Sequence, residues 1–78
     1  MIGKMLYLMR QRKHLSQDEL ADILGIARNT ISQYETGKIQ PTFEMVQKIA
    51  QACDFAICFE NGNTGDQFQP IDVLNDED

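Results

Sequence analysis

The sequence predicts a small, mainly α-helical domain that ends in one short β-strand. Three observations favour this fold class: a helix-capping signature at Ser16, glycines where two short helices would end, and alternating apolar spacing after residue 55. With 78 residues, of which 42% are hydrophobic, the chain can bury one modest core. Chains of this size often gain stability from a partner chain, which favours a dimer.

The first helix is expected over residues 2–13. Its apolar side chains recur at the i, i+3, i+4, i+7 spacing of a buried stripe: Ile2, Met5, Leu6 and Met9. Its basic side chains outside that stripe are interpreted as solvated charges, with phosphate contact as the second interpretation: Lys4, Arg12 and Lys13. The first helix therefore offers an apolar face to the core.

A second helix begins after Ser16. The Ser16 hydroxyl can accept from a free backbone amide while Glu19 reaches back, which is the reciprocal capping box. Leu15 and Leu20 have the spacing of a hydrophobic staple across the same helix start. Gly25 follows where a residue of positive φ would end the helix, so the chain turns sharply there.

The third helix lies between this turn and Gly37. Ile31 points inward, whereas the other face carries side chains of the kinds that hydrogen-bond to the edges of bases: Arg28, Asn29, Thr30, Ser32 and Gln33. On an average helix such side chains are only solvated surface. Their position directly after a capped helix and a turn glycine favours nucleic-acid binding instead.

Together, the segments LSQDELADILGI and NTISQYETGKIQP resemble the Cro/C1 (lambda repressor-like, XRE) helix-turn-helix family. The resemblance covers residues 2–54 and includes the alanine of the first motif helix, the turn glycine and the Glu-x-Gly-Lys ending. It implies a bundle of four to five helices whose third helix enters the major groove of DNA. The expected function is transcription regulation in the cytoplasm, by a homodimeric repressor bound to a two-fold symmetric double-stranded operator.

The resemblance also assigns roles to individual residues. The expected base-reading residues are Arg28, Asn29, Ser32 and Gln33. The expected contacts to the DNA backbone are Ser16, Gln17, Thr30, Tyr34, Lys38 and Gln40, with packing against the first helix as the alternative for Tyr34. Arg10 and Glu35 occupy the positions of a structural salt bridge, with direct DNA contact as the alternative for Arg10.

Two positions depart from the family pattern. Ala27 stands where a Ser or Thr usually caps the third helix, a loss of about 1 kcal/mol. His14 replaces a glycine after the first helix, at a position that requires positive φ. The target sequence therefore cannot be transferred from relatives.

Pro41 and Thr42 introduce a fourth helix, with Thr42 as its N-cap. Its expected buried face consists of Phe43, Val46, Ile49, Ala50 and Cys53. Residues 55–60 then alternate as a strand does, and the Asn61-Gly62 dipeptide closes it. A strand cannot stand alone, so two pairings remain open.

The first possible pairing is a hairpin with residues 68–74, which contain Pro70. The second, which we favour, joins the strand to its copy in another chain through Phe55, Ile57 and Phe59. The chain then divides into a helix-turn-helix domain (1–54), a C-terminal strand and dimerisation segment (55–74) and an acidic disordered tail (75–78). This layout is similar to that of HipB-like antitoxin-repressors. It suggests an alternative function, an antitoxin that binds a toxin-like partner through its C-terminal segment and regulates its own operon.

Charge is distributed unevenly along the chain. The formal net charge is −5, but all seven Lys and Arg lie in residues 1–48 beside five acids, a local balance of +2. The last thirty residues carry seven acids and no base. Because local field rather than total charge governs phosphate binding, we expect modest DNA affinity with a clear salt dependence.

Other classes of function find little support in the sequence. Cys53 and Cys58 have no metal-ligand spacing with the single histidine, so we interpret them as free buried thiols and expect no metal site. No nucleophile–base pair or phosphate-binding glycine loop suggests an enzyme or a cofactor. The N-terminal apolar run is too short for a signal peptide or a membrane anchor, so no membrane partner is expected.

Overall fold

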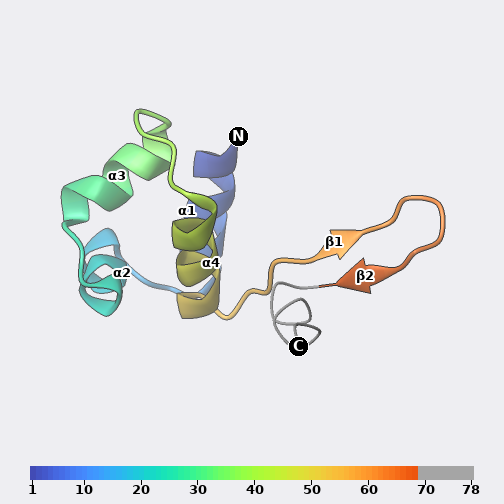
Figure 1. Cartoon of the computed structure of the whole chain (residues 1–78). Coiled ribbons are helices and arrows are strands. Elements are labelled where there is room, and N and C mark those ends of the chain that lie inside the picture. The colour runs from blue at the N-terminus through green and yellow to red at the C-terminus, as the bar shows by residue number, and fades with distance from the viewer. Residues whose placement is uncertain (69–78) are drawn as a thin grey trace, which may run out of the picture.

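The computed structural model describes residues 1–68, which form four helices followed by a two-stranded hairpin (Figure 1). The elements are α1 (Ile2–Arg12), α2 (Gln17–Leu24), α3 (Arg28–Thr36), α4 (Phe43–Ala52), β1 (Phe59–Glu60) and β2 (Gln67–Phe68). The mainly helical class is confirmed. The expected tail at 75–78, and the part of the predicted C-terminal segment that contains Pro70 and Leu74, lie outside the described residues.

The core takes one large, fully buried side chain from each helix. Leu6, Leu20, Ile31 and Ile49 come from α1, α2, α3 and α4 in turn, and each is about 1% exposed. Complete burial of each of these side chains contributes about 1.5–3 kcal/mol. The four helices are therefore held together by a single shared cluster.

The predicted helix boundaries depend on local hydrogen bonds that the structure contains. Ser16 Oγ accepts from the Glu19 amide at 3.0 Å, and the Ser16 amide donates to Glu19 Oε1 at 2.8 Å, so the capping box is complete. Gly25 ends α2 with φ of 71°. Ala27 precedes α3 without any side-chain cap, and His14 adopts φ of 62°, as expected of both departures.

Gly3 allows α1 and α3 to pack closely. A Cβ atom at this position would lie 2.5 Å from the carbonyl oxygen of Tyr34 and 2.7 Å from that of Glu35. Both neighbours are backbone atoms, which cannot turn aside as a side chain can. Gly3 was not predicted from the sequence, because a glycine inside a helix carries no local signal of a close helix crossing.

Two helix residues predicted to be buried are exposed. The α1 face that meets the bundle centres on Gly3, Leu6 and Arg10, so Met5 lies more than a quarter turn away and is 51% exposed. Phe43, at the start of α4, is 53% exposed and stacks on Phe59, with 6.3 Å between ring centroids. Both errors arose because apolar spacing alone does not show where the neighbouring helix lies.

The C-terminal strand also differs from its prediction. Only Phe59 and Glu60 form β1, and residues 55–58 have no regular structure. β1 pairs antiparallel with β2 of the same chain, with Phe59 opposite Phe68. The favoured expectation of pairing with a second chain is therefore corrected to the intrachain hairpin.

A six-residue loop, rather than a tight Asn-Gly turn, closes the hairpin. The Asn61 amide donates to the carbonyl of Asp66 at 2.7 Å, and Asn61 Oδ1 accepts from the amides of Asn63 and Thr64. The residue with positive φ is Gly65, at 79°, rather than Gly62. These local bonds explain why the strand finds a partner within its own chain.

The hairpin extends from the bundle on the side away from α2 and α3 (Figure 1). No helix within residues 1–68 is both long and apolar enough to cross a membrane.

Candidate nucleic-acid interface

The outer face of α3 presents the four predicted base-reading residues together. At 3.6 residues per turn, Arg28, Asn29, Ser32 and Gln33 fall within an arc of roughly 140°. Arg28 and Asn29 are exposed, and Ser32 and Gln33 are partly exposed. Ile31 lies on the opposite side, in the core. The helix thus has one side for packing and one side free to meet a ligand.

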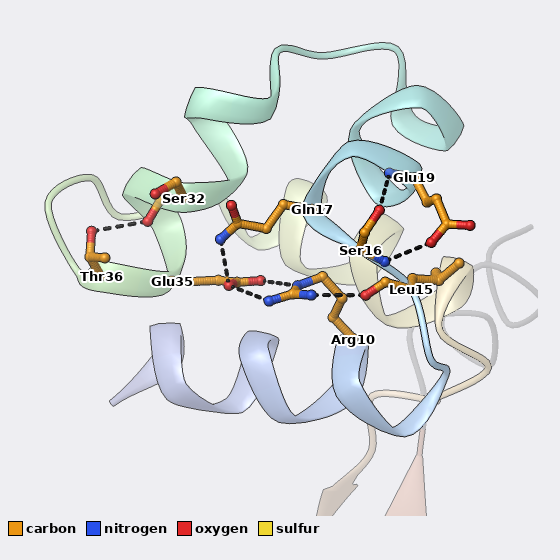
Figure 2. A network of polar contacts seen from close by, with 8 residues as sticks. All are labelled: Arg10, Leu15, Ser16, Gln17, Glu19, Ser32, Glu35 and Thr36. Carbon is orange, nitrogen blue, oxygen red and sulfur yellow. Dashed lines mark hydrogen bonds and ion pairs between the residues drawn. The ribbon is translucent and has the colours of Figure 1, made fainter.

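A buried ion pair fixes α3 against α1. Arg10 Nε and Nη2 donate to the two carboxylate oxygens of Glu35 at 2.6 and 2.9 Å, and Arg10 Nη1 donates to the carbonyl of Leu15 at 2.8 Å (Figure 2). The two charged side chains are only 9% and 7% exposed. The hydrogen bonds that Arg10 donates to Glu35 raise the pKa of Arg10 in spite of its burial. The Arg10 guanidinium is therefore directed into the bundle.

Gln17 extends this network to α2. Its side-chain amide donates to Glu35 Oε1 at 3.1 Å, so Glu35 joins three helices (Figure 2). At the neighbouring cap, Ser16 Oγ accepts from Glu19 and keeps its own hydroxyl proton to donate. The N-terminus of α2 is therefore held in a fixed position beside α3.

The other predicted backbone contacts lie in different surroundings. Lys38 and Gln40 are exposed in the segment after α3, whereas Thr30 is partly buried. Tyr34 is partly buried and packs against the core cluster. The Tyr34 ring therefore has a packing role. Its hydroxyl is the part of the side chain that could contact a phosphate.

The structure brings two more residues to the same region: Lys4, for which phosphate contact was the second interpretation, and Tyr7, which was not predicted from the sequence. They line a cavity of about 370 Å³ with Arg10, Gln17, Glu35 and Thr36. Lys4 Nζ lies 5.1 Å from the centre of the Tyr7 ring. The signal in the sequence is the spacing of these two residues, three apart on α1, which places them on one face with Arg10.

Residues predicted for dimerisation lie on two apolar surfaces away from α3. Phe55 and Ile57 line a groove of about 500 Å³ between α1, α4 and residues 55–58. Phe59 instead belongs to an aromatic cluster, which we define as Phe43, Phe59 and Phe68. The predicted strand face is therefore divided between the groove and the cluster.

The two cysteines differ in their surroundings. Cys53 is 2% exposed, and burial raises the pKa of its thiol. Cys58 is exposed, so the prediction of two buried thiols is wrong for this residue. Cys58 lies directly before β1, in residues 55–58, which have no regular structure.

The sequence of this chain is similar to those of known helix-turn-helix proteins. The model of the helix-turn-helix family matches residues 6–58. The uncharacterized HTH-type transcriptional regulator YonR, derived from the SPβ prophage of Bacillus subtilis, is 34% identical over 97% of this chain and 70% of its own length. Repressor protein C of Escherichia phage P2 is 35% identical over 69% of the chain and 54% of its own length.

A third relative carries a different description. Antitoxin PezA of Streptococcus pneumoniae is 41% identical over 65% of this chain. The match covers 32% of the length of PezA. No solved structure matches the chain.

Proposed function

This chain belongs to the Cro/C1-type helix-turn-helix family of DNA-binding transcription regulators, and we propose that it acts as a homodimeric repressor that inserts α3 into the major groove. The observation that carries this proposal is the free face of α3, on which Arg28, Asn29, Ser32 and Gln33 project away from the buried Ile31. An α-helix fits the major groove, where each base pair presents a distinct pattern of donors and acceptors.

The first turn of α3 supplies the strongest base contacts. Arg28 and Asn29 are the most exposed of the four residues and stand at the end of the helix that enters the groove first. Arginine pairs with O6 and N7 of guanine, whereas asparagine and glutamine pair with N6 and N7 of adenine. The expected half-site therefore contains both guanine and adenine.

Contacts to phosphate position the protein on the duplex. The N-terminus of α2 carries partial positive charge, and Ser16 and Gln17 stand there with a hydroxyl and an amide. Lys38 and Gln40 are exposed in the segment that follows α3, and Lys4 lines the same cavity as Gln17. These residues flank the reading face, as backbone contacts must.

The charge distribution supports this orientation. The acidic hairpin residues Glu60 and Asp66 lie in the segment that extends away from α3 (Figure 1). The phosphate backbone would therefore meet the part of the chain that carries all of its lysines and arginines.

Dimerisation would use the apolar surfaces distant from α3. The groove is lined by Phe55, Ile57 and exposed side chains of α1, and the aromatic cluster continues the apolar surface through Phe59. Burial of both against a second copy would remove apolar area from water. The two α3 helices must then stand about 34 Å apart, or a multiple of this, to meet successive major grooves.

The test is selection of bound duplexes from a randomised DNA pool. The wild type should enrich a two-fold symmetric site, and the Arg28→Ala, Gln33→Ala double variant should lose it. Lys48→Ala with Gln51→Ala, two exposed changes of the same types on α4, is the matched control and should retain it. Absence of enrichment by folded wild-type protein would contradict the proposal.

A second candidate function is that of an antitoxin, supported by the similarity to PezA. The partner would bind the apolar surface of the hairpin, where Phe59 and Phe68 are each 50% exposed. A protein from the same operon that binds the wild type, but not the Phe59→Ser, Phe68→Ser variant, would favour this function. The variant must still select the same DNA site.

A further inference from the structure

Asp18 stands beside the arginine that leads α3. We propose that Asp18 is a specificity-determining residue, which holds Arg28 in the orientation that reads guanine. This inference rests on the proposed function, because it concerns the base that Arg28 would contact.

The ion pair joins the two helices of the motif at their starts. Asp18 lies in the first turn of α2 and Arg28 is the first residue of α3. Asp18 Oδ1 and Arg28 Nε are 3.7 Å apart, which is close enough for charge attraction but too long for a hydrogen bond. The N-terminus of α2 favours a negative charge at Asp18, so the carboxylate is well placed to remain there.

The chemistry of the guanidinium group makes this geometry selective. Arginine carries donors on Nε and on its two terminal nitrogens, which form a planar fork. Guanine is read by two parallel hydrogen bonds to O6 and N7. A carboxylate on the Nε side leaves the terminal pair free to make them and restricts rotation of the long side chain.

The other acidic residues of α2 have different roles. Glu19 accepts the hydrogen bond from the Ser16 amide and is committed to the cap. Asp22, one turn after Asp18, makes no ion pair within the described residues. Asp18 is therefore the α2 carboxylate that faces the reading residues.

The pair is too exposed to be explained by stability. The side chains of Asp18 and Arg28 are 76% and 61% exposed, and exposed ion pairs contribute little to folding. Close to DNA the same pair would lose water and strengthen, while the carboxylate would repel nearby phosphates. Asp18 would thus improve discrimination between bases at some expense of total affinity.

The experiment compares Asp18→Asn with Asp22→Asn and Arg28→Ala. Each protein is used for selection from a randomised pool and for competition between the selected duplex and duplexes with each other base at the Arg28 position. Asp18→Asn should lose roughly fivefold or more of the guanine preference, while its binding to random-sequence DNA is unchanged or tighter. Asp22→Asn removes the same charge from the same helix and should keep the preference.

Each outcome distinguishes this inference from the proposed function. If Arg28→Ala abolishes the guanine preference and Asp18→Asn retains it in full, Asp18 is not a determinant and α3 still reads DNA. A stronger guanine preference in Asp18→Asn would mean that the carboxylate competes with the base, which also overturns the inference. If the wild type selects no sequence, the proposed function fails first. Thermal unfolding of each variant confirms that only folded proteins are compared.

Discussion

The helical bundle and the C-terminal hairpin are held together by different interactions. The bundle buries one large side chain of each helix almost completely: Leu6, Leu20, Ile31 and Ile49. In the hairpin every described residue from Phe59 to Phe68 is exposed. Its order depends on hydrogen bonds of the Asn61 loop and on contacts between half-exposed aromatic rings.

Under the proposed function, this difference would give the two regions separate tasks. A rigid core fixes the position of α3, and groove binding requires such fixed positioning. A two-stranded hairpin alone is marginally stable, so its open apolar side chains gain most from a partner. The hairpin extends on the side of the bundle away from α3, so it can be covered while α3 remains free (Figure 1).

The largest expected effect comes from truncation of the core. Ile49→Ala removes a side chain that is 1% exposed and should lower the free energy of unfolding by about 2–5 kcal/mol. Phe68→Ala, which removes a half-exposed ring of the hairpin, should lower it by about 1 kcal/mol or less. Urea unfolding followed by circular dichroism measures both. Equal losses would mean that the hairpin is part of the core.

The second effect concerns the ion pair of the bundle. Glu35→Ala leaves the Arg10 guanidinium almost buried without its partner and should cost about 2–4 kcal/mol. The Arg10→Met, Glu35→Leu double variant should cost less, because no unpaired charge remains. Glu60→Ala, which removes an exposed acceptor of the Gln67 amide in the hairpin, is the control and should cost little. A double variant less stable than Glu35→Ala would contradict this explanation.

The third and smaller effect is the difference in stability between alanine substitutions at a glycine of the bundle and at a glycine of the hairpin loop. Gly3→Ala places a Cβ against two backbone oxygens of α3 and should cost about 1–3 kcal/mol, even though alanine favours a helix. Gly62→Ala in the hairpin loop has no neighbouring atom within 4 Å and should change stability by less than about 0.5 kcal/mol. Thermal unfolding of both variants measures the difference. Unchanged stability of Gly3→Ala would show that α1 can shift without cost.

Local signals explain how much of the bundle could be predicted from the sequence. Ser16, Gly25 and Thr42 act on backbone atoms only a few residues away, so their effect is readable without the fold. The outer face of α3 follows from helix periodicity once its two ends are known. These local predictions succeeded because cause and effect lie in one segment, whereas the pairing of the distant residues Arg10 and Glu35 was expected only from the family resemblance.

The failures have the opposite origin. Helices or strands that are distant in sequence determine the surroundings of Gly3, Met5 and Phe43. The periodicity of apolar residues along a helix does not show which side of its apolar stripe a neighbouring element covers. The ion pair between Asp18 and Arg28 likewise depends on the angle between two helices. In the hairpin, the Asn61 side chain organises a loop that the Asn-Gly dipeptide alone did not indicate.

The smallest expected effect is a difference between the bundle and the hairpin in how the free energy of unfolding depends on pH. The hydrogen bond from the Ser16 amide lowers the pKa of Glu19, so the folded state holds this carboxylate ionised more strongly than the unfolded chain does. The resulting stability is present at neutral pH and is lost as the pH falls through the folded-state pKa. Glu19→Gln keeps an oxygen that can accept the bond but cannot titrate. Its unfolding free energy should start slightly lower at neutral pH and converge with that of the wild type in acid.

The counterpart in the hairpin is Asn61, whose side-chain oxygen holds the loop through the amides of Asn63 and Thr64. An amide does not titrate in this range, so Asn61→Ala should weaken the hairpin while leaving the pH dependence of bundle unfolding as in the wild type. Urea unfolding from neutral to acid pH, with all three proteins in parallel, measures the slopes. A wild-type slope in Glu19→Gln would assign the acid sensitivity to another carboxylate and remove the cap of α2 from the explanation.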